Sequence, residues 1–180
     1  KDSIQEKRNS KPYKDSVDAV SNTFGILDPL LGYSYTNSFE RWRIGYSGPA
    51  STLNFNTVQG FNATAGLFYN TCTEEYNQAT YASLDANYGL DDDRLRFTGN
   101  IAKRFNKINK RTLGITGGTK VQQFNAQEPI SKLVNSISTL FWERNYMKLY
   151  ELDFARVYYS EELFNGFQFY ANAAYEKRSP

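Results

Sequence analysis

The stretch Tyr81–Arg104 reads YASLDANYGLDDDRLRFTGNIAKR and contains two alternating runs on either side of an acidic turn. From position 82 to position 90, every second residue is Ala, Leu or Tyr, and the residues between them are Ser, Asp, Asn and Gly. A β-strand points alternate side chains to opposite faces, so this run predicts one apolar face and one polar face. The alternation resumes at Leu95, after Asp91–Asp93. We therefore predict an antiparallel hairpin that turns at these three aspartates.

The same alternation recurs along the chain and predicts an all-β, antiparallel fold of roughly eight strands. The expected strands are Leu31–Thr36, Arg41–Ser47, Phe61–Asn70, Tyr81–Leu90, Leu95–Ala102, Leu113–Val121, Leu152–Ser160 and Phe167–Tyr175, and Leu53–Thr57 is a shorter strand candidate. Asn165-Gly166 is a favoured hairpin turn, and Gly117-Gly118 indicates a bulge or a bend. In Phe61–Asn70 and Phe167–Tyr175, small residues are flanked by aromatic ones.

Two kinds of protein show this alternation. A soluble antiparallel sheet covers a core with its apolar face, whereas a membrane barrel turns that face to lipid and its polar face to a wet lumen. Aromatic rings favour both membrane interfaces, and the chain contains 14 Tyr and 13 Phe. No apolar run approaches the ~18 residues of a transmembrane helix. We therefore expect a transmembrane β-barrel, or part of a larger one. The alternative is a soluble antiparallel β-sheet that binds a hydrophobic ligand or a protein partner.

Two segments fall outside this pattern. Residues 1–22 are polar and charge-alternating, so we expect a helical or irregular polar connector at residues 1–28, before a barrel segment at residues 29–180. Ser131–Tyr150 allows two interpretations, a helix with Ser131 as its N-cap or a strand followed by a tight turn at Glu143–Asn145. The chain begins at Lys1 and stops directly after a strand pattern, so we expect a fragment of a longer protein.

The composition argues against catalysis. The chain contains no histidine, which excludes His-based acid–base catalysis, Ser-His triads and imidazole metal sites. Cys72 is the only cysteine and is predicted to be an incidental thiol in a polar loop at positions 71–80. Glu74-Glu75 and Glu161-Glu162 are carboxylate pairs, but neighbours on a strand point to opposite faces. We therefore predict no catalytic residue, no metal and no cofactor, and we keep a carboxylate-based hydrolase only as a third option.

The remaining charged groups give weak signals. Asp91–Asp93 lacks the alternating ligand spacing of an EF-hand calcium loop and is expected to be an exposed charged turn. The 21 Lys and Arg nearly balance the 19 Asp and Glu, so bulk charge does not point to nucleic acid. A basic cluster around Phe105 is a candidate contact for lipopolysaccharide or another polyanion. Its members are Lys103, Arg104, Lys107, Lys110 and Arg111.

The polar positions of the strands are the candidate functional residues. In a barrel they line the lumen and bias what passes or binds there. The lumen-facing candidates are Ser83, Asp85, Asn87, Arg96, Thr98, Asn100, Lys120, Gln168 and Asn172. The alternative is a solvated face that binds no ligand.

Five stretches resemble a known family: LLGYSYTNSFERW at 30–42, LNFNTVQGF at 53–61, GGTKVQQFN at 117–125, ERNYMKLYE at 143–151 and YSEELFNGF at 159–167. They are similar to uncharacterised outer-membrane proteins of Bacteroidota, in which a carboxypeptidase-regulatory-like domain precedes a large β-barrel region. The resemblance implies a connector just before the barrel and further strands after residue 180. It implies no functional residues.

Together these observations predict a non-enzymatic segment of an outer-membrane β-barrel from a Gram-negative bacterium. We expect it to contribute to transport, assembly or surface interaction. The expected partners are outer-membrane lipid and either lipopolysaccharide or another envelope protein, with no nucleic acid.

Overall fold

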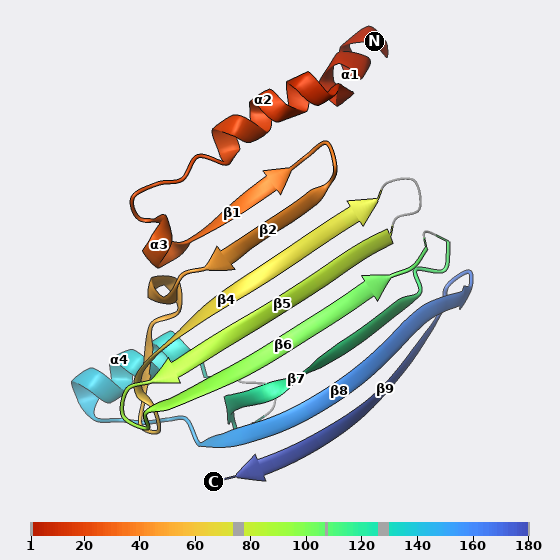
Figure 1. Cartoon of the computed structure of the whole chain (residues 1–180). Coiled ribbons are helices and arrows are strands. Elements are labelled where there is room, and N and C mark those ends of the chain that lie inside the picture. Colours follow the sequence, from red (N-terminus) through yellow and green to blue (C-terminus); the bar gives the residue numbers. More distant parts are fainter. Residues whose placement is uncertain (1, 74–77, 107, 126–129, 180) are drawn as a thin grey trace.

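A computed structural model describes residues 2–73, 78–106, 108–125 and 130–179. Its main element is one curved antiparallel sheet with the strand order β1-β2-β4-β5-β6-β7-β8-β9, and β3 pairs with β4 outside this path (Figure 1). The strands are β1 (Gly32–Asn37), β2 (Trp42–Ser47), β3 (Asn54–Asn56), β4 (Gly60–Thr73), β5 (Gln78–Gly89), β6 (Arg94–Arg104), β7 (Thr112–Gln123), β8 (Leu149–Phe164) and β9 (Phe167–Ser179). The helices are α1 (Asp2–Asn9), α2 (Lys11–Ser21), α3 (Asp28–Leu31), the 3-10 helix η1 (Pro49–Thr52) and α4 (Lys132–Trp142).

The antiparallel β-fold is confirmed, but the described strands do not close into a barrel. The sheet path begins at β1 and ends at β9, and no pairing between described residues joins the two. At the β1 edge, the Asn22 side chain accepts a hydrogen bond from the Thr36 backbone nitrogen and donates one to its carbonyl, both at 2.8 Å. An amide side chain thus takes the place of a neighbouring strand at this edge. Residues 167–178 of β9, at the other edge, are exposed throughout.

Both predicted hairpin turns are confirmed. The β5–β6 ladder pairs Gly89 with Arg94 across the Asp91–Asp93 turn and continues to Ala79 and Arg104. The β8–β9 hairpin turns at Asn165-Gly166, where Gly166 has a φ of +82°. Glycine adopts this left-handed backbone without the steric cost that a side chain would add.

The structure of one segment answers a prediction that the sequence left open, and the structure of another corrects a prediction that is wrong. Residues 132–142 of Ser131–Tyr150 form α4 with Ser131 at the N-cap, so the helix interpretation is confirmed and the strand interpretation is wrong. The polar loop predicted at 71–80 is also wrong over part of its length, because β4 extends to Thr73 and β5 begins at Gln78. Backbone pairing continues there despite the polar side chains, and Cys72 lies in β4 rather than in a loop. Glu74-Glu75 lies outside the described residues.

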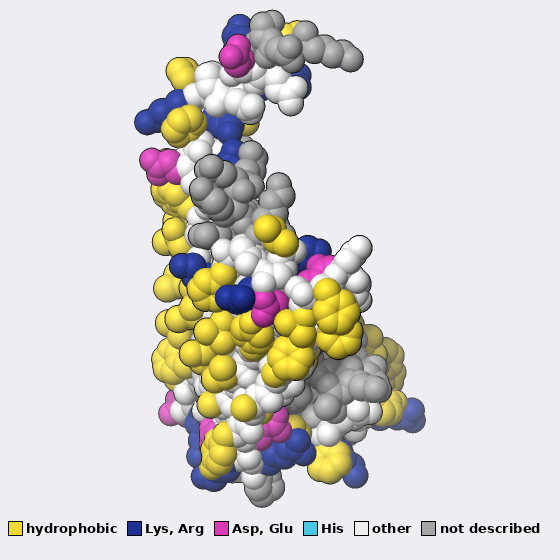
Figure 2. Space-filling model, turned by 90° about the vertical axis from the view of Figure 1, so that its right-hand side faces the viewer, with side chains coloured by type: hydrophobic (Ala, Val, Ile, Leu, Met, Phe, Trp, Pro, Cys, Tyr) yellow, Lys and Arg dark blue, Asp and Glu magenta, His cyan; other side chains and the backbone are white. Residues whose placement is uncertain are grey.

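The two faces of the sheet are exposed in the opposite way to those of a soluble sheet. We call the side that carries Leu84 and Ile101 the apolar face and the side that carries Asp85 and Arg96 the polar face. Ile101 is 63% exposed and Leu84 49%, whereas Arg96 is 4% exposed. No described helix or second sheet covers the apolar face, and Figure 2 shows its hydrophobic side chains as a column along the left side of the molecule.

A conventional hydrophobic core is absent from the described residues, among which Met147 and Leu152 are the buried hydrophobic ones. The chain has an accessible surface of 12545 Å². A compact soluble chain of this mass, 20.7 kDa, would expose roughly 8,900 Å². The excess follows from a sheet that is one layer thick over most of its area.

Candidate functional site

A cavity of about 600 Å³ lies on the polar face at the end of the sheet that carries α4. Strands β4 to β7 form its floor, and η1, β3, α4 and the start of β8 surround it. Most of the residues that line it are polar. They are Ser51, Thr52, Asn54, Phe55, Asn56, Gln59, Asn62, Thr64, Asp85, Asn87, Arg96, Thr98, Thr119, Lys120, Val121, Lys132, Met147 and Leu149.

Helix α4 is held over the cavity by its polar side chains. The Ser136 hydroxyl accepts a hydrogen bond from the Phe55 nitrogen at 2.9 Å and donates one to the Phe55 carbonyl at 3.0 Å, which joins α4 to β3. Asn135 is fully buried and accepts a hydrogen bond from the Tyr146 nitrogen at 2.9 Å. Leu133 and Phe141 of the same helix are exposed. Helix α4 therefore buries polar groups and exposes apolar ones, as the sheet does.

The structure brings five of the nine sequence-predicted candidates together at the cavity: Asp85, Asn87, Arg96, Thr98 and Lys120. Asp85 pairs across the ladder with Thr98, and Asn87 with Arg96. The next pair along the ladder, Ser83 and Asn100, lies outside the cavity. Gln168 and Asn172 lie on the exposed strand β9, also away from it.

A network of amide side chains fixes one wall of the cavity. Gln59 donates a hydrogen bond to the Asn87 side-chain oxygen at 2.7 Å and accepts one from Asn56 at 3.1 Å. Asn87 in turn donates to the Thr64 hydroxyl at 3.0 Å. Sequence reasoning missed Asn56 and Gln59, because only tertiary contact relates this loop to β5. Their side chains satisfy one another, so this wall is rigid rather than reactive.

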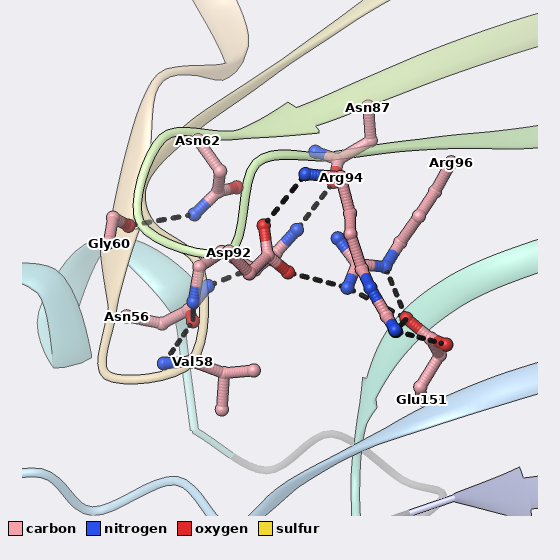
Figure 3. A network of polar contacts seen from close by, with 10 residues as sticks. Asn56, Val58, Gly60, Asn62, Asn87, Asp92, Arg94, Arg96 and Glu151 are labelled. Atoms are coloured by element: carbon pink, nitrogen blue, oxygen red, sulfur yellow. Dashed lines mark hydrogen bonds and ion pairs between the residues drawn. The ribbon is translucent and has the colours of Figure 1, made fainter.

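An ionic network holds Arg96, its one described member that lines the cavity (Figure 3). The Arg96 guanidinium lies 2.5 Å from an Asp92 carboxylate oxygen and donates to Glu151 from Nε at 2.8 Å. Arg94, 64% exposed, contacts the same Glu151 carboxylate at 3.1 Å. The prediction of an exposed acidic turn holds for Asp91 and Asp93 and is wrong for Asp92, which is half-buried. Arg96 needs a partner because a buried, unpaired charge is costly.

The predicted bend at Gly117-Gly118 is confirmed and shapes the cavity. The β6–β7 ladder ends at the pair Thr98 and Gly118, where Gly118 has a φ of +134°. A Cβ atom on Gly118 would lie 2.0 Å from the Phe97 carbonyl oxygen, so the position requires glycine. Beyond the bend, residues 119–121 all contribute to the cavity, although a regular strand would point them to alternate faces.

At the other end of the sheet, acidic residues pair with the basic cluster. Arg111 lies 2.9 Å from Glu161, and Lys110 lies 3.6 Å from Glu162. The hydrogen bond that Arg111 donates to the Glu161 carboxylate raises the pKa of Arg111 above its ordinary value. Glu161 and Glu162 therefore form ion pairs with the loop after β6, and Lys107 lies outside the described residues. Within the described part of the chain, no group of three or more potential ligand residues could hold a metal ion.

Residues 27–180 match a family model described as the C-terminal domain of a family of unknown function, DUF5686. The chain belongs to this family. The DUF5686 match covers the whole sheet together with η1, α3 and α4. Searches of curated proteins and of solved structures returned no match. Among the described helices of this DUF5686 chain, none has the length and apolar character needed to cross a membrane.

Proposed function

We propose that the sheet forms part of the wall of a transmembrane β-barrel in the outer membrane of a Gram-negative bacterium. Its role is non-enzymatic, in transport, assembly or surface interaction. One observation carries the proposal: the apolar face is exposed across the sheet, while the polar face is the more buried one. Leu67 in β4 is 60% exposed, and Ile115 in β7 is 57% exposed. Lipid is the surrounding medium that stabilises such a face, since contiguous apolar patches of this kind are rare on soluble monomers.

Strand geometry supports the same proposal. Strands β4 to β9 contain 11 to 16 residues each. A membrane-spanning strand needs about 9–11 residues, so each of these is long enough. The run Phe61–Tyr69 has small residues between aromatic ones, and so has Phe167–Tyr175. This spacing fits aromatic side chains at the two membrane interfaces.

The partners follow from the geometry of the proposed wall. The apolar face contacts outer-membrane lipid, and the polar face lines a wet lumen together with Ser83, Asn100, Gln168 and Asn172. The open edge at β9 requires further strands or another envelope protein, because an unpaired transmembrane edge leaves backbone groups unsatisfied in lipid. Lys103 and Arg104 remain candidate contacts for lipopolysaccharide. The resemblance to Bacteroidota proteins with a carboxypeptidase-regulatory-like domain favours the same compartment.

A pair of neighbouring substitutions tests the proposal. Ile101→Lys places a charge on the apolar face and should destabilise the chain folded in lipid vesicles by about 2–4 kcal/mol. Asn100→Lys, one residue away on the polar face, should change stability by no more than about 0.5 kcal/mol. Urea titration of both variants in vesicles measures the difference.

The soluble alternative makes the opposite prediction. Ile101 is already exposed, so a lysine there would cost a soluble sheet almost nothing. If the chain stays monodisperse in buffer without detergent, and Ile101→Lys is as stable as Asn100→Lys, the membrane-wall proposal is wrong and the soluble β-sheet module is the better account.

A further inference from the structure

Two side chains in the cavity keep hydrogen-bonding capacity that no described residue uses. Arg96 is 4% exposed, and its Nη1 atom is buried without a hydrogen-bond partner among the described residues. The Asp85 carboxylate lies over Gly66, where a Cβ atom would meet its Oδ1 at 2.1 Å, and accepts no hydrogen bond from a described residue. Leaving a buried polar group unsatisfied costs about 1–3 kcal/mol, so a donor placed against the Asp85 carboxylate would be stabilising.

The two groups face the same space. Asp85 pairs with Thr98, and Asn87 pairs with Arg96, so Asp85 and Arg96 are diagonal neighbours on adjacent strands and both line the cavity. Diagonal neighbours of this kind are about 7–8 Å apart at Cα. The cavity therefore presents a strong acceptor, the Asp85 carboxylate, beside a guanidinium that its ion pairs hold in place.

We propose that this cavity binds a neutral, polyhydroxylated ligand of the size of a mono- or disaccharide. A hydroxyl group donates to the Asp85 carboxylate and also accepts from the amide and ammonium donors of the lining, so one chemical group suits both kinds of partner. The volume of about 600 Å³ falls in the range of small-molecule sites. This site requires only the polar face and its cover, so it stands apart from the membrane proposal.

The charge of the cavity favours a neutral ligand. The charged lining residues are Asp85, Arg96, Lys120 and Lys132, and Arg96 forms ion pairs with Asp92 and Glu151. With Arg96 neutralised by these ion pairs, the free Asp85 carboxylate disfavours an anion and the two lysines disfavour a cation. The Lys120 ammonium, 5.2 Å from the Phe154 ring centroid, already has a cation–π contact.

The lining also disfavours two other classes of ligand. A divalent cation would need several carboxylate or carbonyl oxygens, and Asp85 is the one carboxylate among the described lining residues. A lipid chain would displace water from the amides and hydroxyls that dominate the lining and would offer them no hydrogen bonds in return. Phe55 and Met147 provide a small apolar surface for the C–H groups of a sugar ring.

Calorimetric titration of the full chain with neutral disaccharides tests the proposal. The chain is refolded in a zwitterionic detergent, because glycoside detergents would compete, and is titrated with maltose, cellobiose and lactose. We expect saturable binding of at least one of them at a single site. Asp85→Ala should weaken that binding about tenfold or more, since a hydrogen bond to a charged group is lost.

The matched control is Ser83→Ala, one position along the same face of β5 and outside the cavity, which should bind as the unaltered chain does. Inorganic phosphate and trialanine serve as the anionic and peptide probes. The proposal is overturned if no disaccharide binds saturably, if phosphate or trialanine binds more tightly, or if the two variants have equal affinity. Circular dichroism establishes that both variants are folded.

A second test of the proposal uses the unaltered chain and needs no substitution. A ligand that binds only the folded chain shifts the unfolding equilibrium by mass action. A saturating concentration of the tightest-binding disaccharide should therefore raise the urea midpoint of the unaltered chain. An unchanged midpoint at saturation would also overturn the proposal.

Discussion

The polar face and the apolar face of this sheet are built from the same strands, yet the described elements outside the sheet cover the polar face and leave the apolar face exposed. Strand β6 illustrates the contrast: Leu95, Phe97 and Ile101 are exposed, and Arg96 between them is buried. Helix α4, strand β3 and the amide network all lie against the polar face. In a soluble sheet the covering elements would lie on the apolar side.

The contrast shows which interactions hold this fold together. With few buried hydrophobic side chains among the described residues, side-chain order at the covered end depends on hydrogen bonds and ion pairs between polar groups. Such networks are stabilising when fully paired and costly when one member is lost. The apolar face instead depends on the medium around it. Substitutions on the two faces should therefore have different energetic signatures.

The largest effect is expected from breaking the ionic network around Arg96 on the polar face. Arg96→Ala leaves Asp92 and Glu151 without their buried partner and should lower the free energy of unfolding by about 3–5 kcal/mol. Arg94→Ala removes an exposed guanidinium from the same Glu151 and should cost no more than about 1 kcal/mol. Urea titration in detergent micelles measures both. Equal losses in the two variants would mean that burial does not decide the strength of this network.

The next effect concerns glycines on the two faces. Gly118→Ala forces a side chain onto a backbone with a φ of +134° and against the Phe97 carbonyl, and should destabilise the chain by about 2–4 kcal/mol. Gly99→Ala is the control, because its Cβ would meet nothing closer than 3.8 Å, and it should change stability by no more than about 0.5 kcal/mol. Thermal or urea unfolding gives both values. A Gly118→Ala variant as stable as Gly99→Ala would contradict the bend described here.

The smallest effect is expected at the β1 edge of the sheet, where both faces end. Asn22→Ala removes two hydrogen bonds to the Thr36 backbone and should cost about 1–2 kcal/mol. Thr23→Ala, at the adjacent residue, removes only local hydrogen bonds within the α2 turn and serves as the control. Amide hydrogen exchange at Thr36 provides the direct measurement. Its exchange should become faster in Asn22→Ala and stay unchanged in Thr23→Ala.

Much of the fold could be predicted from the sequence because it follows from short-range periodicity. The alternation in Tyr81–Arg104, the Asp91–Asp93 turn and the Asn165-Gly166 turn each depend on neighbouring residues alone. The bend at Gly117-Gly118 was also predictable, since glycine permits a backbone that other residues rarely adopt. The missed continuation of the strands, β4 through residues 71–73 and β5 from residues 78–80, has the complementary cause, because ladder pairing there outweighed local polarity.

The sequence by itself determined which side chains share a face, because the two-residue period of a strand is a property of the backbone. Only the tertiary structure decided which of those residues meet. Arg96 and Glu151 are 55 positions apart, and Phe55 and Ser136 are 81 apart. No local pattern encodes such contacts, since they depend on how the sheet curves and on where α4 comes to rest. The polar positions were therefore readable from the sequence, and the cavity that five of them share was not.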